Sequence, residues 1–288
     1  MPELPEVELV VRELKKDVPG QTIQSVDISD VVTESKARGR EAIIKGRAVD
    51  DFIESMRGRT ISALERKSKY IYFTLDDGEQ LLVNHLGMTG AWFVVDSVES
   101  ITEEKYRKHA HAIFHLEDGR QLIYSDIRRF GELRLLQEES DYPPLLKLAP
   151  EPFDERAEQY FIEQAASDRW KEKPIKTVIM DGTVVSGCGN IYATEALFRR
   201  RIHPNRTTSR ISEAEQRALF REIVTILQES IDRGGSTISD YQRGNGETGE
   251  MQHFHQMYKK KTCPVCLRPT RSMSINNRTS TYCPSCQK

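Results

Sequence analysis

A change of hydrophobic pattern near the middle of the chain constrains its fold more than any other feature. Before position 143, short runs of alternating and β-branched residues recur, at 22–28, 60–75, 80–83, 91–95, 111–116 and 121–124. After position 152, apolar residues recur at helical spacing instead. The two patterns are separated by prolines that interrupt regular structure: Pro143, Pro144, Pro150 and Pro152. The sequence therefore predicts a β-rich first half and a helical second half joined by a linker.

The first half is expected to be a mostly antiparallel β-sandwich preceded by one helix. Asp77-Gly78 and Asp118-Gly119 each separate two strand-like runs, and such pairs are typical of tight hairpin turns. A helix is predicted over residues 5–16, where apolar side chains share one face: Val7, Val10, Val11 and Leu14. Residues 35–47 are rich in charge and glycine, and we expect them to form an exposed excursion.

The second half contains one helix with clear start and stop signals. Ser212 and Glu215 have the spacing of a capping box, in which each side chain bonds to the other residue's backbone N–H. Apolar residues follow at helical spacing: Leu219, Phe220, Ile223, Ile226 and Leu227. Gly234-Gly235 is predicted to end this helix, because glycine adopts the left-handed conformation of a helix C-cap without strain.

Four of the five cysteines indicate a metal site. They form two Cys-x-x-Cys pairs, Cys263 with Cys266 and Cys283 with Cys286, separated by sixteen residues. This pattern suits one tetrahedral Zn²⁺ held by four thiolates, with no position left for a catalytic water, so the metal is expected to be structural. Disulfides are the alternative, which a cytoplasmic location disfavours. The fifth, Cys188, is expected to be a small buried residue.

The charge distribution indicates a polyanionic partner although the net charge is only −2. Residues 251–288 hold seven lysines or arginines and no acid, so the preceding 250 residues carry a net −9. A basic end on an acidic body favours a nucleic-acid site, and a solvated basic tail is the alternative. The sequence has neither an apolar run of about 18 residues nor a secretory signal, which predicts a cytoplasmic protein without a membrane span.

The first six residues, Met-Pro-Glu-Leu-Pro-Glu, contain a candidate nucleophile. Loss of Met1 would expose the secondary amine of Pro2, and an α-amino group titrates at about 7.7–8.0, against about 10.4 for a lysine. Glu3 and Glu6 are close enough in sequence to move protons beside it. The alternative is that the prolines only begin a helix. While Met1 is present, the amine is blocked.

These features occur together with further short motifs, at 66–70, 85–88, 108–111, 126–131 and 187–193. Together they resemble the formamidopyrimidine-DNA glycosylase and endonuclease VIII family of bacterial DNA repair enzymes, over nearly the whole chain. Leucine rather than glycine at position 4 makes the chain similar to the formamidopyrimidine branch and not to the endonuclease VIII branch. The resemblance implies an α+β multidomain fold with a β-sandwich, a helix–two-turn–helix domain and a zinc finger. The domains would span 1–136, 154–250 and 251–288, with a linker at 137–153.

The resemblance also implies a mechanism. The Pro2 amine would attack C1′ of a damaged nucleotide, expel the base and form a Schiff base that permits β,δ-elimination. Glu3 would be the general acid/base, and Glu6 would support the amine. Lys69 would donate a proton or bind phosphate in β-elimination, and Arg278 would be its counterpart in δ-elimination. For Lys69 and Arg278, surface salt bridges are the alternative.

Other positions match DNA-contacting residues of the family: His85, His109, Arg128, Lys171 and Asn190. Asn190 follows a Gly-x-Gly turn, where its amide and nearby backbone N–H groups could bind phosphate. Because the damaged nucleotide must leave the base stack, three side chains would fill the void: Met88, Arg128 and Phe130. Packing in a protein core is the alternative for the methionine and phenylalanine.

The implied partner is double-stranded DNA with oxidised bases or abasic sites, bound by a monomer. Residues 234–249 align with the family's lesion-capping loop, whose length favours oxidised purines such as 8-oxoguanine and formamidopyrimidines. Ser239 and Asp240 depart from relatives, as do Lys259, Lys260 and Lys261 and, mildly, Asn277, which tolerates a left-handed conformation. A preference for oxidised pyrimidines and a non-catalytic damaged-DNA binder remain alternatives. A zinc-dependent transcriptional regulator would need a helix that reads base edges, and none is evident.

Overall fold

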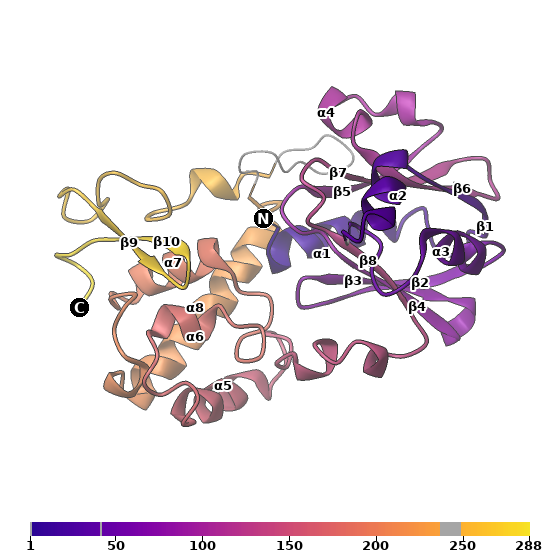
Figure 1. The fold of residues 1–288 in the computed structure, drawn as a ribbon. Helices are drawn as coiled ribbons and strands as arrows, with labels where there is room; N and C mark the ends of the chain where they lie inside the picture. Colours follow the sequence, from indigo (N-terminus) through magenta and orange to yellow (C-terminus); the bar gives the residue numbers. More distant parts are fainter. Residues whose placement is uncertain (1, 41, 237–248) are drawn as a thin grey trace. The chain divides into compact units, whose positions relative to one another are not determined.

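The computed structural model describes residues 2–40, 42–236 and 249–288, which form two compact units (Figure 1). Among these residues, the first unit comprises Pro2, most of 6–146, Ser236 and Gly249. The second comprises 3–5, 147–235 and 250–288. The division between Leu146 and Lys147 falls within the segment expected to be a linker.

The first unit contains two four-stranded antiparallel sheets. One has the order β1-β6-β7-β5 and the other β2-β3-β4-β8. The strands of the first sheet are β1 (Ile23–Ile28), β6 (Ala110–Leu116), β7 (Gln121–Asp126) and β5 (Gly90–Val95). Those of the second are β2 (Ile61–Lys67), β3 (Tyr70–Leu75), β4 (Gln80–His85) and β8 (Glu132–Leu136). The helices of the first unit are α2 (Asp30–Ala37), α3 (Val49–Met56), α4 (Glu104–Arg107) and most of α1 (Leu4–Leu14), whose first two residues belong to the second unit.

One hydrophobic core includes side chains from both sheets and therefore makes this unit a β-sandwich, as predicted. Trp92 of β5 illustrates the contact, since its ring lies 5.0 Å from that of Phe73 on β3. The indole Nε1–H donates to Asn84 Oδ1 on β4 over 2.9 Å, so the polar atom of this buried side chain is paired. Helix α1 buries its predicted apolar face in the same core: Val7, Val10, Val11 and Leu14.

The hairpin turns predicted at Asp77-Gly78 and Asp118-Gly119 are confirmed, since they connect β3 to β4 and β6 to β7. Residues 60–75, expected as a single run, instead form two strands. Ser68 adopts a φ of 57° and, with Lys69, reverses the chain between β2 and β3. The turn lies within the polar run 65–69, where no Asp-Gly or Asn-Gly pair marks it. Strand β8 was not predicted either.

The exposed excursion predicted at 35–47 is wrong at its C-terminal end. Ala42, Ile43 and Ile44 are buried, and Ile43 and Ile44 belong to the main core together with Leu133. The Leu133 N–H donates to the Ile43 carbonyl over 2.8 Å, and the Leu133 carbonyl accepts from Lys45 N–H over 3.0 Å. Three consecutive apolar residues lie beside the edge of β8, and their burial outweighs the charge of the surrounding residues.

The second unit is helical and ends in a hairpin. Its helices are α5 (Ala157–Ala166), α6 (Ile175–Ile179), α7 (Asn190–Arg199) and α8 (Glu213–Asp232), and its strands are β9 (Arg271–Ile275) and β10 (Arg278–Tyr282). The capping box is confirmed, since Ser212 Oγ accepts from Glu215 N–H at the start of α8. Gly234 and Gly235 follow its end with φ of 74° and 79°, as predicted. Among the described residues, no helix has the length and apolar character needed to cross a membrane.

Candidate active site and metal centre

The carboxylate of Glu3 lies at the N-terminus of α7. Its Oε2 accepts from Gly189 N–H and its Oε1 from Ile191 N–H, each over 2.8 Å. The first N–H groups of a helix have no partner within the helix and carry its partial positive charge, so they suit a carboxylate. Only 2% of Glu3 is exposed. The chain therefore holds an acid, covalently next to Pro2, in one orientation.

The two glycines of the Gly187-Cys188-Gly189 turn are required by this arrangement. A Cβ on Gly189 would lie 2.4 Å from Glu3 Cδ, and a Cβ on Gly187 would lie 2.5 Å from the Leu4 side chain. Gly187 also has a φ of 75°, and its carbonyl accepts from Leu4 N–H over 3.1 Å. Glu3 and Leu4 of the N-terminal motif thus pack against the distant 187–193 motif. Cys188 is buried, as predicted.

A buried lysine that the sequence analysis missed accompanies Glu3. Lys176 of α6 is fully buried, and its Nζ donates to Thr194 Oγ1 over 2.7 Å. Burial lowers the pKa of Lys176 to about 8, and the negative charge of Glu3 opposes that shift. A lysine beside apolar residues in a short helix carries no sequence signal of such a position. The nearby Glu3 carboxylate favours the charged form of this lysine.

Tyr258, also missed, connects Glu3 with the finger. Burial raises the pKa of Tyr258, as does the charge of Glu3, whereas a hydrogen bond with the Asn190 side chain and the charge of Arg278 lower it. The Tyr258 hydroxyl is therefore electrostatically coupled to three of the predicted site residues. A tyrosine directly before three lysines was an available sequence signal.

Buried Glu195 of α7 holds the segment that carries Tyr258. Its Oε1 accepts from Met257 N–H over 3.0 Å and from Tyr258 N–H over 2.7 Å, and its Oε2 accepts from Gln256 N–H over 2.7 Å. Three backbone N–H groups compensate the burial of this carboxylate. Segment 256–258 is consequently fixed against the same helix whose first turn binds Glu3.

The surroundings of Asn190 alter its predicted role. Its Nδ2 donates to the Thr279 carbonyl of β10 over 3.2 Å, which ties α7 to the finger hairpin. The neighbouring N–H groups of Gly189 and Ile191 bond to Glu3. Those two donors are thus occupied by the protein's own carboxylate, and phosphate binding here would depend on the Asn190 side chain.

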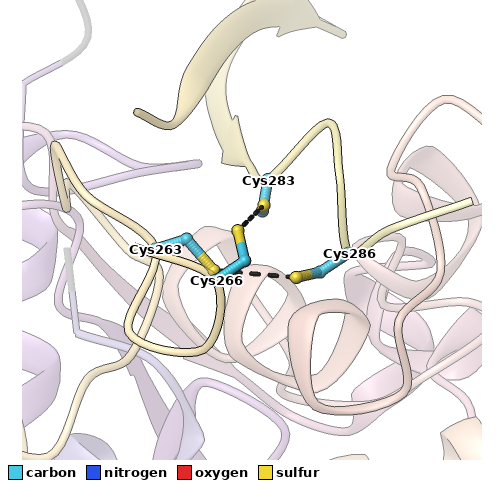
Figure 2. Close-up of side chains that lie close together, drawn as sticks. All are labelled: Cys263, Cys266, Cys283 and Cys286. Carbon is cyan, nitrogen blue, oxygen red and sulfur yellow. Dashed lines mark hydrogen bonds between the residues drawn. The ribbon is translucent and has the colours of Figure 1, made fainter. Parts of the chain in front are cut away.

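The four cysteines of the two Cys-x-x-Cys pairs converge, as Figure 2 shows. The Sγ atoms of Cys263 and Cys286 lie 3.9 Å apart and those of Cys266 and Cys283 lie 3.5 Å apart. All four ligand atoms lie within 4.8 Å of one another, and all four cysteines are free. These separations are too long for a disulfide, about 2 Å. They suit a tetrahedral metal with metal–sulfur bonds of about 2.3 Å, which places sulfurs about 3.8 Å apart.

Arg278 lies at the turn of the hairpin between the cysteine pairs. Asn276 and Asn277 precede it with φ of 51° and 58°, so the left-handed conformation suggested for Asn277 is confirmed. Asparagine tolerates this conformation better than most residues. Arg278 begins β10 and is exposed. The finger presents this guanidinium from a turn whose base is held by the cysteines.

In the first unit, Lys69 and His85 lie close together. Tyr70 and His85 are paired across β3 and β4, with ring centroids 5.0 Å apart. Burial, together with the positive charge of Lys69, lowers the pKa of His85 to about 4. Its Nδ1 accepts from Gly87 N–H over 3.1 Å, so the neutral ring carries its proton on Nε2. At neutral pH, His85 therefore offers an uncharged donor beside a lysine.

The three proposed void-filling side chains belong to two loops of the first unit. Met88 lies between β4 and β5, and Arg128 and Phe130 lie between β7 and β8. Phe130 is 57% exposed and so is no core residue, and the Arg128 guanidinium lies 4.8 Å from the centre of its ring. Met88 is half-buried. An exposed aromatic ring beneath a cation is available for contact with a partner.

The remaining candidates have local partners. His109 Nδ1 donates to the Lys105 carbonyl over 2.7 Å. Lys171 Nζ pairs with Asp168 Oδ1 over 2.6 Å on the surface, which raises the pKa of Lys171. The Lys171 carbonyl accepts from Ser209 N–H over 2.8 Å. The backbone at Lys171 is therefore fixed within the second unit, while its ammonium group forms a surface ion pair.

Pro2 is buried, and Met1 lies outside the described residues. Glu6 Oε1 accepts from Ser236 N–H over 2.9 Å, where the predicted lesion-capping loop begins. Ser239 and Asp240 of that loop also lie outside the described residues. Glu6 is therefore bonded to the backbone at the start of the loop.

Comparison with known families finds two matches that together cover most of the chain. Residues 1–133 match the formamidopyrimidine-DNA glycosylase N-terminal domain, and residues 148–242 match the formamidopyrimidine-DNA glycosylase H2TH domain. A formamidopyrimidine-DNA glycosylase from Exiguobacterium is 38% identical, over all of both chains. One from Halalkalibacterium halodurans is 37% identical, again over all of both chains.

Solved structures give the same result. The Fpg protein of Thermus thermophilus has a TM-score of 0.82 at 34% identity, and the match covers 99% of this chain and 98% of that one. A complex of Lactococcus lactis Fpg with DNA containing an abasic site has a TM-score of 0.81 at 32% identity, covering 99% of each chain. MutM in complex with DNA containing carbocyclic 8-oxo-G has a TM-score of 0.83 at 32% identity, covering all of both chains.

Proposed function

Because this chain belongs to the formamidopyrimidine-DNA glycosylase family of DNA repair enzymes, we propose that it is a bifunctional DNA glycosylase and AP lyase that removes oxidised purines. One observation carries the proposal above the others. The buried Glu3 carboxylate, next to Pro2 in the chain, is oriented by Gly189 and Ile191 N–H groups. A glutamate serving only to begin a helix would not need this enclosed position.

In the proposed reaction, the Pro2 amine attacks C1′ of the damaged nucleotide and the base leaves. Glu3 acts as general acid/base, assisting sugar opening and protonation of the leaving group. Glu3 Oε2 accepts from Gly189 N–H over 2.8 Å and from Tyr192 N–H over 3.5 Å, and Oε1 accepts from Ile191 N–H over 2.8 Å, so three backbone donors orient the carboxylate. The resulting Schiff base acidifies the C2′ proton, and elimination then cleaves the strand. Met1 must be absent for the amine to react.

Lys69 and Arg278 are proposed to assist β- and δ-elimination as cations that bind the phosphates flanking the lesion. Asn190 and Tyr258 are proposed to contact the same phosphate as Arg278. The hydrogen bond between Asn190 and Tyr258 and the effect of the Arg278 charge on Tyr258 support this grouping. His85 would add a neutral donor beside Lys69. His109 and Lys171 are further proposed DNA contacts, and Lys171 would exchange its Asp168 partner for a phosphate.

The proposed metal is one structural Zn²⁺ bound by Cys263, Cys266, Cys283 and Cys286. The sulfur separations fit a tetrahedral site, and four thiolates leave no open position for a reacting ligand. When bound, the ion cross-links the two Cys-x-x-Cys turns. The protein supports this arrangement through Gln287, whose Oε1 accepts from Cys283 N–H and whose Nε2 donates to the Ile202 carbonyl. Arg278 would thereby be presented from a rigid hairpin.

The proposed partner is double-stranded DNA that contains an oxidised base or an abasic site. Relatives whose structures are similar are described in complexes with abasic-site DNA, with Fapy-dG DNA and with carbocyclic 8-oxo-G DNA. Met88, Arg128 and Phe130 would fill the space left by the extruded nucleotide. We place the enzyme in the bacterial cytoplasm as a monomer, with domains at 1–136, 154–250 and 251–288.

Reduction with borohydride in the presence of abasic-site DNA tests the proposal. Protein lacking Met1 is expected to form a covalent adduct, and protein that retains Met1, in which the Pro2 amine is blocked, is expected to form none. Duplexes with 8-oxoguanine, formamidopyrimidine or thymine glycol, compared side by side, then establish the lesion preference. Binding to abasic-site DNA without an adduct or cleavage would indicate the non-catalytic alternative. Faster excision of thymine glycol would indicate a preference for oxidised pyrimidines.

A further inference from the structure

Two neighbouring loops of the first unit carry the proposed void-filling side chains, and we refer to residues 86–89 and 127–131 as the insertion loops. The first follows β4 and contains Met88, and the second follows β7 and contains Arg128 and Phe130. Two buried polar residues, Thr89 and Asp126, end one loop and precede the other. Neither belongs to the catalytic or DNA-binding groups proposed above.

Hydrogen bonds through these two side chains join the insertion loops. Thr89 Oγ1 donates to Asp126 Oδ1 over 2.6 Å and accepts from Arg128 N–H over 2.9 Å. Asp126 Oδ1 lies 3.2 Å from the same N–H, and Asp126 Oδ2 accepts from Gly131 N–H over 2.7 Å. The backbone on both sides of Phe130 is therefore bonded to two residues that are buried from solvent.

The backbones of the loops also touch directly. A Cβ on Gly87 would lie 2.5 Å from both Gly131 N and the Phe130 carbonyl carbon. A Cβ on Gly131 would lie 1.8 Å from the Tyr124 hydroxyl oxygen. Glycine at position 87 permits this close approach of the two loop backbones, and glycine at position 131 leaves room for the Tyr124 hydroxyl of β7.

Between the two bonded N–H groups the chain adopts a strained conformation. Arg129, which separates Arg128 from Phe130, has a φ of 54°. The left-handed region costs a residue with a Cβ about 1–2 kcal/mol, and it persists only where surrounding interactions determine it. The bonds at Arg128 and Gly131 lie on either side of this residue. They account for the persistence of the strain and set the directions of the two flanking side chains.

We propose that Thr89 and Asp126 are positioning residues that hold Met88, Arg128 and Phe130 as one preformed insertion unit. The proposal rests on the proposed function, in which these side chains replace an extruded nucleotide. Burying a carboxyl group costs free energy unless hydrogen bonds compensate it, and the Thr89 hydroxyl and Gly131 N–H supply such bonds to Asp126. Because the loops are already ordered before DNA binds, the binding step carries no entropic cost for ordering them.

Thr89→Val and Thr89→Ser form the decisive pair, because valine has the shape of threonine without its hydroxyl and serine retains the hydroxyl. Single-turnover base excision is measured on an 8-oxoguanine duplex, and strand cleavage on single-stranded abasic DNA, where no void requires filling. Loss of the buried hydrogen bonds is expected to slow excision on the duplex about tenfold in the valine variant. Serine should remain within about twofold of the wild type, and all variants should cleave the single strand normally.

A second readout follows insertion itself. The fluorescence of 2-aminopurine placed opposite the lesion reports disruption of the stack, and its rise should be slower in Thr89→Val and in Asp126→Asn. Thr60→Val is the matched control, because Thr60 Oγ1 bonds to Thr22 Oγ1 over 3.1 Å elsewhere in the same unit. This control is expected to leave both rates unchanged.

Equal losses on the duplex and the single strand, or duplex excision at the wild-type rate in Thr89→Val, would overturn the positioning role. If Asp126→Asn fails to fold by circular dichroism, the two Thr89 variants still decide. If the wild type cleaves neither substrate, the proposed function fails instead. The 2-aminopurine signal would then still establish whether Thr89 controls insertion.

Discussion

Glu3 in the second unit and Asp126 in the first are both buried carboxyl groups whose oxygens accept backbone N–H groups. At Glu3 the first turn of α7 orients the carboxylate, and in the proposed reaction the carboxylate is the group that acts. At Asp126 the carboxyl group orients the backbone, and Arg128 and Phe130 are the side chains that act. The same contact can thus prepare an acid for chemistry or a loop for recognition.

Among the substitutions that test this comparison, Glu3→Gln should have the largest effect, on the rate of base excision. Glu3→Gln is expected to slow base excision about 10³-fold, because it removes the proton-transfer group. Asp126→Asn should still cleave abasic single strands at the wild-type rate. Single-turnover kinetics on both substrates measure the difference. Glu117→Gln, an exposed glutamate, is the control. Comparable losses of excision in the Glu3 and Glu117 variants would remove Glu3 from the mechanism.

Removal of the metal should affect the second unit and leave the first unit folded. Chelation is expected to weaken DNA binding at least about tenfold while the β-sandwich stays folded, because its core contains no cysteine ligand. Trp170→Phe leaves Trp92, in the first core, as the single tryptophan. Fluorescence anisotropy of labelled DNA and Trp92 emission are then followed together. Loss of both signals at the same chelator concentration would contradict a separable finger.

Glu195 offers a third buried carboxylate that should affect stability more than chemistry. Glu195→Gln replaces one acceptor oxygen with an amide N–H group facing the backbone donors of Gln256, Met257 and Tyr258. The free energy of unfolding should fall by about 2 kcal/mol. Chemical denaturation measures this, with Glu117→Gln as control. An unchanged midpoint would show that segment 256–258 is held by other contacts.

Stability in acid depends on two buried histidines. Burial lowers the pKa of His111 and of His255 to about 4, from an ordinary value near 6.5. Between pH 6.5 and 4 the unfolded chain binds more protons, so stability is full above 6.5 and falls as the pH decreases to 4. Each histidine contributes a slope of at most about 1.4 kcal/mol per pH unit.

His111→Gln in the first unit and His255→Gln in the second should each reduce this acid sensitivity. Denaturant unfolding at pH 7, 6, 5 and 4 checks it, and the exposed His253 provides a control substitution. Identical pH profiles for wild type and both variants would show that carboxyl groups alone govern acid unfolding.

Features read from adjacent residues were the ones the sequence predicted well. The α8 capping box, the two Asp-Gly hairpins and the cysteine spacing each depend on a few neighbouring residues. The turn at Ser68 escaped prediction because no Asp-Gly or Asn-Gly pair marks it, and the burial of Ile43 and Ile44 escaped it because charged residues surround them. Lys176, Tyr258 and Glu195 were missed because their environment is made by residues distant in the chain.

The sequence by itself determined the family, the two-part change from strands to helices and the ligand set of the metal site, since local pattern and motif spacing carry that information. Only the tertiary structure decided which groups satisfy the buried acids. The N–H groups that bind Glu3 come from positions 186 and 188 residues further along the chain. Asp126 meets the Thr89 hydroxyl across 37 residues. Burial demands a partner for each polar atom, and the packing of distant segments selects which partner that is.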